Sequence, residues 1–297
     1  MVLFQQNSPN YHLYICIKIK IMSTTKVWYI TGASKGMGFS VAKQLLSKGH
    51  SVAATSRSVN AFEQFAEYGD SFLALEVDLK SEQSIALSFK KTIKKFGRVD
   101  VIVNNAGYGL GGALEELTSD EINENFEVNF FAAVRVVQKA LPYLREQRSG
   151  HIINISSIAG FAPALGWSMY CAAKFALSGL SEALANDLQP LGIHVTNVLP
   201  GWFRTSFAKP DSIAYNKNQM QEYSYLREYH EKMNNMDGIQ LGNPDLIADA
   251  FLELVFSANP PVNLFLGSDA FNRAKSKIQQ LNKGMSDWEA VSVSTDF

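Results

Sequence analysis

A tyrosine and a lysine stand four residues apart in the segment YCAAK, from Tyr170 to Lys174. This spacing places both side chains on one face of a helix, which the sequence predicts over residues 169–188. A nearby ammonium favours the phenolate form and lowers the pKa of the tyrosine. The phenol could then exchange a proton with an alcohol or a carbonyl oxygen near neutral pH. The pair indicates acid–base chemistry on such a group.

The spacing alone is weak evidence, because Tyr14 and Lys18 share it in a segment for which we expect no function. Tyr170 differs in its neighbours along the chain. It follows a predicted strand that ends in Ile155-Ser156-Ser157, and it precedes a predicted strand that ends in Leu199-Pro200-Gly201. Ligands bind beyond the carboxyl ends of strands in open α/β sheets. The position of Tyr170 therefore favours a functional role.

A glycine-containing loop, TGASKGMG at residues 31–38, follows the first predicted strand and opens a helix. Glycines there permit a tight turn and a close approach of the backbone to a pyrophosphate. The amino terminus of the helix adds N–H groups for the phosphates. The spacing GxxxGxG differs from the common GxGxxG, and three glycines could also form a plain turn. We expect a phosphate-binding loop.

The end of the second predicted strand reads AATSRS, residues 53–58, where enzymes that prefer NAD place an acidic residue. No carboxylate is present there, and Arg57 could hold a ribose 2′-phosphate through charge-assisted hydrogen bonds. Lys35 in the glycine loop could add a second positive charge. Alternatively, both are solvated surface cations. The pattern predicts NADP (NADPH) as cofactor, with NAD the less favoured alternative.

Short β-branched, apolar segments alternate with helical segments from residue 26 onward, which is typical of parallel strands joined by crossover helices. The expected fold class is α/β, a doubly wound parallel (Rossmann) sheet of about seven strands with helices on both faces. We expect a single domain over residues 22–297. The expected strands lie at residues 26–31, 51–56, 72–77, 100–105, 151–156, 193–198 and 262–267.

Residues 202–242 depart from this alternation, because the segment is polar and helix-prone and shows no strand pattern. Loops of such length inside a compact domain are usually functional lids or disordered segments. The segment follows the carboxyl end of a predicted strand. We therefore expect a substrate lid at about 202–242.

Composition excludes several other classes of protein. Apolar residues make up 46%, charged residues 19%, and the formal net charge is -1 without a basic stripe or charged tail. This argues against nucleic acid and anionic membrane as partners and favours a small-molecule substrate. The two cysteines, Cys16 and Cys171, form neither a disulfide framework nor a zinc pattern, and Cys171 is interpreted as a core residue. We expect a cytoplasmic protein without a metal.

The first 21 residues contain an apolar run interrupted by Lys18 and Lys20. The run is too short to span a bilayer, and its charges lie on the wrong side for a secretory signal. We expect a non-structural extension upstream of a start at Met22.

Taken together, these motifs resemble the short-chain dehydrogenase/reductase family over residues 26–267. TGASKGMG matches the glycine loop of its compact branch, Asp78-Leu79 its adenine-contact pair, and Asn104-Asn105-Ala106-Gly107 its NNAG motif. Asn129 matches its helix asparagine, YCAAK its active-site helix, and PGWFRT, ending in Thr205, the segment that holds the nicotinamide carboxamide. The segment from Trp202 to Gly242 and the ending DWEAVSVSTDF are similar to a branch that includes steroid and retinol dehydrogenases and many uncharacterised bacterial relatives.

The resemblance implies that Tyr170 is the general acid/base and that Lys174 lowers its pKa and holds the nicotinamide ribose. Ser157, thirteen residues before Tyr170, would hydrogen-bond the reacting oxygen, and Asn129 would order a proton-relay water. Alternatively, Asn129 is a helix cap or core amide and Asp78 a helix N-cap. The residues expected to bind the cofactor are Gly32, Ser34, Lys35, Gly36, Met37, Gly38, Arg57, Asp78, Leu79, Asn105, Ala106, Gly107, Tyr170, Lys174, Pro200, Gly201 and Thr205.

Substrate identity is open at this stage, because one fold supports many chemistries. Aromatic and apolar residues at or beyond strand ends suggest an apolar carbonyl compound, although each could be core packing; they are Tyr108, Phe161, Leu165, Trp167, Trp202, Phe203 and Phe207. Rival interpretations are a non-enzymatic NADP sensor and an enzyme for carrier-bound keto groups.

Family members usually pair the helices at about 129–144 and 172–184, which implies a homodimer or homotetramer.

Overall fold

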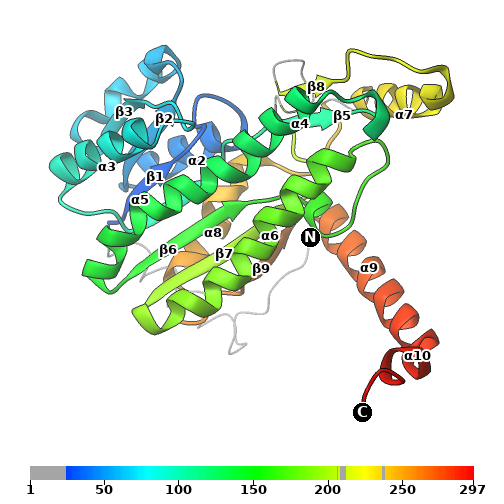
Figure 1. The fold of residues 1–297 in the computed structure, drawn as a ribbon. Helices are drawn as coiled ribbons and strands as arrows, with labels where there is room; N and C mark the ends of the chain where they lie inside the picture. The colour runs from blue at the N-terminus through cyan, green and yellow to red at the C-terminus, as the bar shows by residue number, and fades with distance from the viewer. Residues whose placement is uncertain (1–24, 206, 208–211, 236–237) are drawn as a thin grey trace, which may run out of the picture.

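The computed structural model describes residues 25–205, 207, 212–235 and 238–297. A seven-stranded sheet, parallel throughout, forms its centre (Figure 1). Its strands are β1 (Val27–Ile30), β2 (Ser51–Ser56), β3 (Phe72–Glu76), β4 (Val101–Asn104), β6 (Gly150–Ile155), β7 (Ile193–Pro200) and β9 (Asn263–Leu266). All seven predicted strands are confirmed. The expected extension at residues 1–21 and the start at Met22 lie outside the described residues.

The strand order is β3-β2-β1-β4-β6-β7-β9. The chain therefore builds the sheet outward in one direction from β1 to β3 and then in the other from β4 to β9. Doubly wound sheets bind ligands where this reversal occurs, beyond the carboxyl ends of the central strands. The loops after β1 and β4 lie side by side there, and they carry TGASKGMG and NNAG.

Helices cover both faces of the sheet, as predicted. One core packs α2 (Gly36–Ser47) and α8 (Ile247–Phe256) against Trp28 and Ile30. The other packs α3 (Glu82–Phe96), α5 (Ala132–Gln147) and α6 (Ser168–Leu188) against Tyr29 and Ile102. Successive strand side chains point to opposite faces, so a strand buried on both faces is apolar throughout.

Local signals account for the helix ends. Ser81 caps α3 by accepting the backbone N–H of Ser84 at 3.2 Å, and Gly97 ends the helix in the left-handed conformation. A continuous helical stretch contains α4 (Ser119–Phe126), a π-helical turn (Glu127–Phe131) and α5. A long 3₁₀ segment covers Val59–Ser71, and shorter turns occur at Leu114–Glu116, Ile158–Gly160, Gln189–Leu191, Gln221–Tyr223 and Pro244–Leu246.

The expectation that residues 202–242 contain no strand is wrong. Strand β8 (Ile213–Tyr215) pairs in parallel with β5 (Gly109–Gly111) to form a separate two-stranded sheet, and α7 (Ser224–Asn234) follows it. Two backbone hydrogen bonds close the base of the excursion: the Gly242 N–H donates to the Trp202 carbonyl at 3.1 Å, and the Arg204 N–H donates to the Gly242 carbonyl at 2.9 Å. We call residues 212–235 the cap.

The chain ends in α9 (Ser268–Asp287) and α10 (Glu289–Val293), and α9 runs away from the sheet (Figure 1). Its first turns pack Ala270 and Ala274 on Ile158 and Ala162. Among the described helices, none is both long and apolar enough to cross a membrane.

Candidate active site

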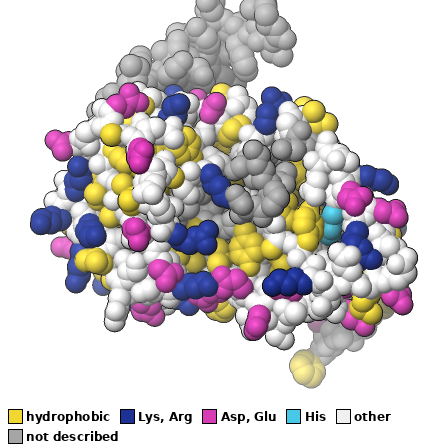
Figure 2. Space-filling model, turned by 90° about the horizontal axis from the view of Figure 1, so that it is seen from above, with side chains coloured by type: hydrophobic (Ala, Val, Ile, Leu, Met, Phe, Trp, Pro, Cys, Tyr) yellow, Lys and Arg dark blue, Asp and Glu magenta, His cyan; other side chains and the backbone are white. Residues whose placement is uncertain are grey.

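A cleft of about 910 Å³ runs along the carboxyl ends of the strands and extends beneath the cap. Lysine and arginine side chains border hydrophobic ones on this side of the molecule (Figure 2). The predicted residues that line the cleft are Gly32, Ser34, Lys35, Gly36, Met37, Arg57, Asp78, Leu79, Asn105, Ala106, Gly107, Tyr108, Asn129, Ser157, Trp167, Tyr170, Lys174, Pro200, Gly201, Trp202, Phe203, Thr205 and Phe207. Residues distant in sequence thus meet in one place.

The glycine loop has the geometry of an anion cradle. Gly32 and Gly36 have φ angles of 62° and 60°, which L side chains rarely adopt. A Cβ on Gly32 would lie 2.8 Å from the Cα of Ala106, so this position requires glycine. Helix α2 begins at Gly36 without a side-chain cap and without an acid in its first turn. Its first N–H groups therefore suit the phosphates of a dinucleotide.

Asn105 in NNAG fastens this loop to its neighbour. Its Nδ2 donates to the carbonyl oxygens of Thr31 and Gly32 at 2.9 and 3.0 Å, while the Thr31 hydroxyl accepts the N–H groups of Asn105 and Ala106. Gly38 does not line the cleft; it packs beneath the loop, where a Cβ would collide with the Asn105 amide. Both motifs therefore form one rigid surface.

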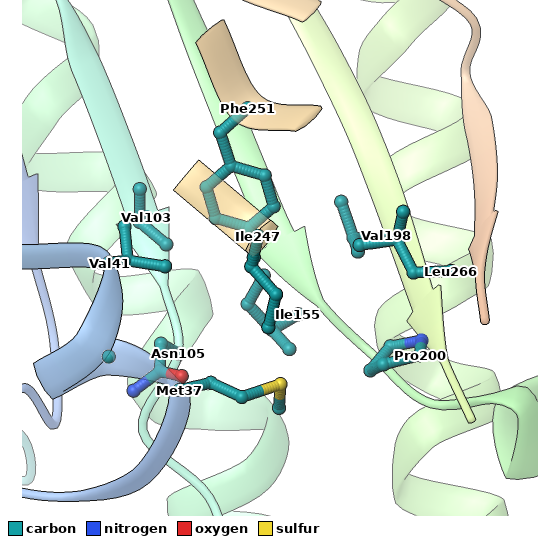
Figure 3. A pocket seen from close by; sticks show the side chains of 11 residues that line it. Met37, Val41, Val103, Asn105, Ile155, Val198, Pro200, Ile247, Phe251 and Leu266 are labelled. Carbon is teal, nitrogen blue, oxygen red and sulfur yellow. The ribbon is translucent and has the colours of Figure 1, made fainter. Parts of the chain in front are cut away.

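Apolar side chains fill the space beneath the loop, between α2, α8 and the strand ends (Figure 3). Met37 extends there toward Pro200, and Phe251 and Ile247 descend from α8. The remaining cavity is only about 10 Å³, roughly the room for one water probe, and its lining is apolar. It is a packing gap in the support of the loop.

The far end of the cofactor cleft carries the predicted cations. Arg57 and Lys35 are both exposed there, and Asp78 and Leu79 line the same end after β3. Asp78 is not a helix N-cap: its carboxylate accepts the Lys80 N–H at 2.9 Å, and Ser81 caps the helix. The donors, glycines and cations of the cleft fit a dinucleotide.

At the centre, Tyr170 and Ser157 meet across the cleft from α6 and the end of β6. Burial raises the pKa of the Tyr170 phenol well above its usual value, and a hydrogen bond with Ser157 acts in the opposite direction. The net direction is opposite to the lowered pKa that was expected, because burial outweighs the hydrogen bond. The Lys174 Nζ lies 5.8 Å from the centre of the Tyr170 ring and donates to the Ile155 carbonyl at 3.0 Å.

Ser156 is directed differently from Ser157. Its hydroxyl donates to the Lys174 carbonyl and contacts the Ser178 hydroxyl, both at 2.9 Å, so it joins β6 to α6. The Ser157 hydroxyl instead accepts the Ala159 N–H at 3.1 Å and reaches Tyr170. The geometry therefore favours Ser157 over its neighbour as the partner of the phenol.

Lys174 and Asn129 lie behind the tyrosine, and both are buried. Burial lowers the pKa of Lys174 to about 8, so its charge is easily altered. Asn129 accepts the Tyr108 N–H at 3.2 Å and donates to the carbonyls of Tyr108 and Asn125. Its side chain thus holds the turn after NNAG, and the core-amide alternative describes part of its role.

The half of the cleft beneath the cap is aromatic. Ring centres of Trp167 and Phe207 lie 5.9 and 6.2 Å from that of Tyr170. Phe161 and Leu165 were also predicted as pocket residues, but neither lines the cleft. Phe161 packs on Phe265 behind β6, with ring centres 5.2 Å apart, and the Leu165 side chain faces solvent with 51% exposure. Sequence position placed them near the loop without fixing their direction.

Hydrogen bonds to β9 and α9 hold the backbone of the segment that follows β7. Gly201 N–H donates to the Leu266 carbonyl at 2.9 Å, and the Trp202 N–H donates to Asp269 at 2.7 Å. The hydroxyl of Thr205 accepts the Phe207 N–H at 3.2 Å. Pro200, Gly201 and Thr205 therefore reach the cleft in a fixed turn.

Sequence reasoning missed Glu116, which fastens the cap. This side chain is 1% exposed and pairs with Arg227 at 2.8 Å. It also accepts the Met220 N–H at 2.7 Å and the Asn216 amide at 3.0 Å. No local signal marks a glutamate whose partners lie about a hundred residues later.

Cys171 is a buried free thiol in a small cluster with Trp167 and Ile213, as interpreted. The described part of the chain contains no cluster of three or more histidine, cysteine or acidic side chains suited to a metal ion.

Comparison with known proteins defines the family. The model of the short chain dehydrogenase family matches residues 26–216. Oxidoreductase BOA17 of Botryotinia fuckeliana is 31% identical over 275 residues, 91% of this chain and 99% of its own. A 3-ketodihydrosphingosine reductase of Bacteroides thetaiotaomicron is 37% identical over 240 residues, 80% of this chain and 86% of its own. The chain belongs to the short-chain dehydrogenase/reductase family and is an oxidoreductase.

Solved structures agree. A short-chain dehydrogenase from Streptomyces avermitilis superposes with a TM-score of 0.86 at 34% identity, covering 92% of this chain and 100% of its own. A 3-ketoacyl-(acyl-carrier-protein) reductase from Brucella melitensis, complexed with NADH, has a TM-score of 0.68, 25% identity, and coverage of 81% and 96%. An alcohol dehydrogenase from Thermococcus sibiricus, complexed with 5-hydroxy-NADP, has a TM-score of 0.66 and 26% identity, and the match covers 82% of this chain and 96% of that chain. Relatives thus bind either nicotinamide dinucleotide.

Proposed function

We propose that this protein is an NADP(H)-dependent oxidoreductase that interconverts a carbonyl and an alcohol on an apolar small molecule, with Tyr170 as general acid/base. The observation that carries the proposal is the meeting of Tyr170 and Ser157 at the junction of the two halves of the cleft. One half has the glycine cradle, and the other has aromatic walls.

In the proposed reaction, Tyr170 and Ser157 act on the oxygen of the substrate carbonyl. A bound nicotinamide would supply the hydride that forms the new C–H bond. The carbonyl oxygen then gains negative charge, and Tyr170 transfers its proton there to complete the alcohol. Ser157 stabilises the same oxygen with a hydrogen bond. The raised pKa of Tyr170 keeps the phenol protonated before the reaction, which suits the reductive direction.

Lys174 supports the tyrosine from behind. Its ammonium is fixed by the Ile155 carbonyl and lies on the cofactor side of the phenol. A positive charge there stabilises the phenolate left after proton transfer. The buried site strengthens this interaction, because little water screens it.

The preference for NADP rests on the charges at the distal end of the cofactor cleft. Ser56 occupies the position where an acid would accept hydrogen bonds from a ribose, and Arg57 and Lys35 border the same space. A 2′-phosphate would find two cations there.

The direct test follows NADPH and NADH consumption against a panel of ketones, aldehydes and quinones. We expect turnover of apolar ketones or aldehydes, faster with NADPH. Binding of NADPH by a folded protein without turnover of any carbonyl would instead support the sensor alternative.

We also infer a homodimer or homotetramer in a reducing, cytoplasmic setting. Phe131 and Phe175 are 45% and 41% exposed on the two helices expected to pair. Exposed large apolar side chains on adjacent helices are typical of interfaces. Sedimentation of the wild type and of Phe131→Ser with Phe175→Ser tests the assembly, and a variant that assembles equally well contradicts it.

The segment 202–242 is proposed as the substrate lid. Within this segment, Ile213 of the cap lines the cleft, and the ring of Tyr215 lies against Trp167, with ring centres 6.2 Å apart. Substrate selection would then depend on the cap.

A further inference from the structure

The substrate half of the cleft has an uneven charge distribution. All four acidic residues that line the cleft precede Asn129 in the chain; they are Glu76, Asp78, Glu124 and Glu127. Two of them are neutralised locally, Glu124 by Lys80 at 2.7 Å and Glu127 by Arg135. The lining from Ser156 onward contains no acid among the described residues and two cations, Lys174 and Arg273.

These two cations have different surroundings. Lys174 is buried behind Tyr170 and donates to the Ile155 carbonyl. Arg273 comes from α9 and lines the cleft, and its partner Pro163 directly precedes Ala164, which packs in one cluster with Trp167 and Tyr170. It therefore lies where the remote part of a substrate would be, when the reacting carbonyl is at Tyr170.

The guanidinium of Arg273 is held in place. Its Nη2 donates to the Pro163 carbonyl at 2.6 Å, which fixes one edge of the planar group. None of the ion pairs among the described residues involves Arg273. Arginine has five N–H donors in a rigid fork that matches a carboxylate or phosphate. The remaining donors suit an anionic ligand.

A second observation places this charge close to the reaction centre. Burial raises the pKa of the Cys171 thiol, and the positive charge of Arg273 acts against that shift. Cys171 directly follows Tyr170 and accepts the Ala164 N–H at 3.5 Å. The field of Arg273 thus reaches the residues that border the phenol.

We propose that Arg273 binds an anionic group at the far end of the substrate, so the natural substrate has a carbonyl or alcohol, an apolar body against Trp167 and Phe207, and a terminal carboxylate. The inference rests on the proposed function, because it assigns the substrate class of that same site. A long cleft with aromatic walls and a cation at its end discriminates by charge as well as by shape.

The test uses pairs of molecules that differ only in this charge. Each pair is a keto acid and its methyl ester, with a range of spacer lengths between carbonyl and carboxylate, and NADPH consumption gives kcat and KM. At the best spacer length, wild type should prefer the acid by about tenfold or more in kcat/KM. Arg273→Gln should remove this preference by raising KM for the acid about tenfold, with the ester unchanged.

Matched variants separate charge from folding. Lys275→Gln removes an exposed cation of the same helix that does not line the cleft, so it should leave both substrates unaffected. Arg273→Glu should turn the preference toward the ester, and the loss in Arg273→Gln should shrink at high salt. Two results would overturn this inference and leave the proposed function intact. One is turnover of the ester without any preference for the acid, and the other is an equal effect of Arg273→Gln on the acid and on the ester. Absence of turnover for every acid and ester would overturn both.

Discussion

Asn129 and Lys174 converge on the α-carbon of Gly107. A Cβ placed on this glycine would lie 2.6 Å from the Asn129 side-chain oxygen and 3.3 Å from the Lys174 Nζ. The last residue of NNAG therefore allows the amide and the ammonium to approach the cleft together. A larger residue would displace both groups that lie behind Tyr170.

Gly107→Ala should lower kcat/KM by about tenfold or more and destabilise the protein by about 1–3 kcal/mol, because overpacking a rigid site forces its neighbours to move. Steady-state kinetics and thermal unfolding measure the two effects. Gly284 in α9 is the control, since a Cβ there meets nothing within 4 Å. Gly284→Ala should stabilise the helix by about 0.5–1 kcal/mol and keep full activity. Equal behaviour of the two variants would contradict the role given to Gly107.

Glu116→Gln should loosen the cap. The change removes the charge that pairs with Arg227 and leaves buried donors poorly satisfied, at a cost of about 1–3 kcal/mol. Hydrogen exchange of the 216–227 backbone should become faster, and KM for the carbonyl substrate should rise.

Glu115 is the matched control, because its hydrogen bond to the Tyr223 hydroxyl at 2.9 Å is exposed. Glu115→Gln should change stability by less than about 0.5 kcal/mol. Unchanged exchange and KM in Glu116→Gln would show that the cap does not depend on this contact.

The protein should lose stability as the pH falls from about 6.5 to 3, in part through His151. Burial lowers the pKa of His151 to about 3, against an ordinary value of 6.5, and its Nε2 contacts the Thr196 hydroxyl at 2.9 Å. In this window the unfolded chain binds a proton that the folded protein does not, so the free energy of unfolding decreases with acidification.

Urea unfolding at several pH values tests this dependence. His151→Gln should flatten the curve between pH 6.5 and 3, whereas His194→Gln should change it less, since burial is the larger cause of the lowered pKa of His151 and the His194 charge the smaller one. If His151→Gln keeps the full dependence of the free energy of unfolding on pH, titratable groups other than His151 cause that dependence.

Sequence predicted the seven-stranded sheet because its strands are buried on both faces and read as apolar runs. It could not predict β5 and β8. Each has three residues, Gly109–Gly111 lacks β-branched residues, and the pair joins positions about a hundred residues apart. Such strands form because tertiary contacts hold them, not because of local preference.

The site, like the fold, was only partly predictable from the sequence. Motif spacing predicted that Tyr170, Ser157 and Lys174 belong together, but it could not predict that burial would raise the pKa of Tyr170, since burial depends on the whole fold. Arg273 was missed because α9 follows the last recognised motif, and only the packing of Ala270 and Ala274 turns this residue toward the cleft.

Arg57→Ala should weaken NADPH binding about tenfold, because a charge-assisted hydrogen bond contributes roughly 1.5–3 kcal/mol. NADH lacks the 2′-phosphate and should be nearly unaffected. Titration of each cofactor by fluorescence measures the difference, which should decrease at high salt.

Ser56→Asp combined with Arg57→Ala should reverse the preference, since an aspartate accepts hydrogen bonds from the ribose and repels the phosphate. The NADP assignment is ruled out if the wild-type protein already binds NADH more tightly than NADPH. It is also ruled out if Arg57→Ala weakens the binding of both cofactors equally.

Tyr170→Phe tests the proposed proton transfer by Tyr170. The phenol hydroxyl is lost while the buried ring and its contacts with Trp167 and Phe207 are kept. Single-turnover reduction of the best ketone, with NADPH binding measured on the same sample, separates chemistry from cofactor affinity. We predict that the rate is lower than that of wild type by on the order of 10²- to 10⁴-fold, with unchanged NADPH affinity. A rate close to that of wild type would contradict the mechanism.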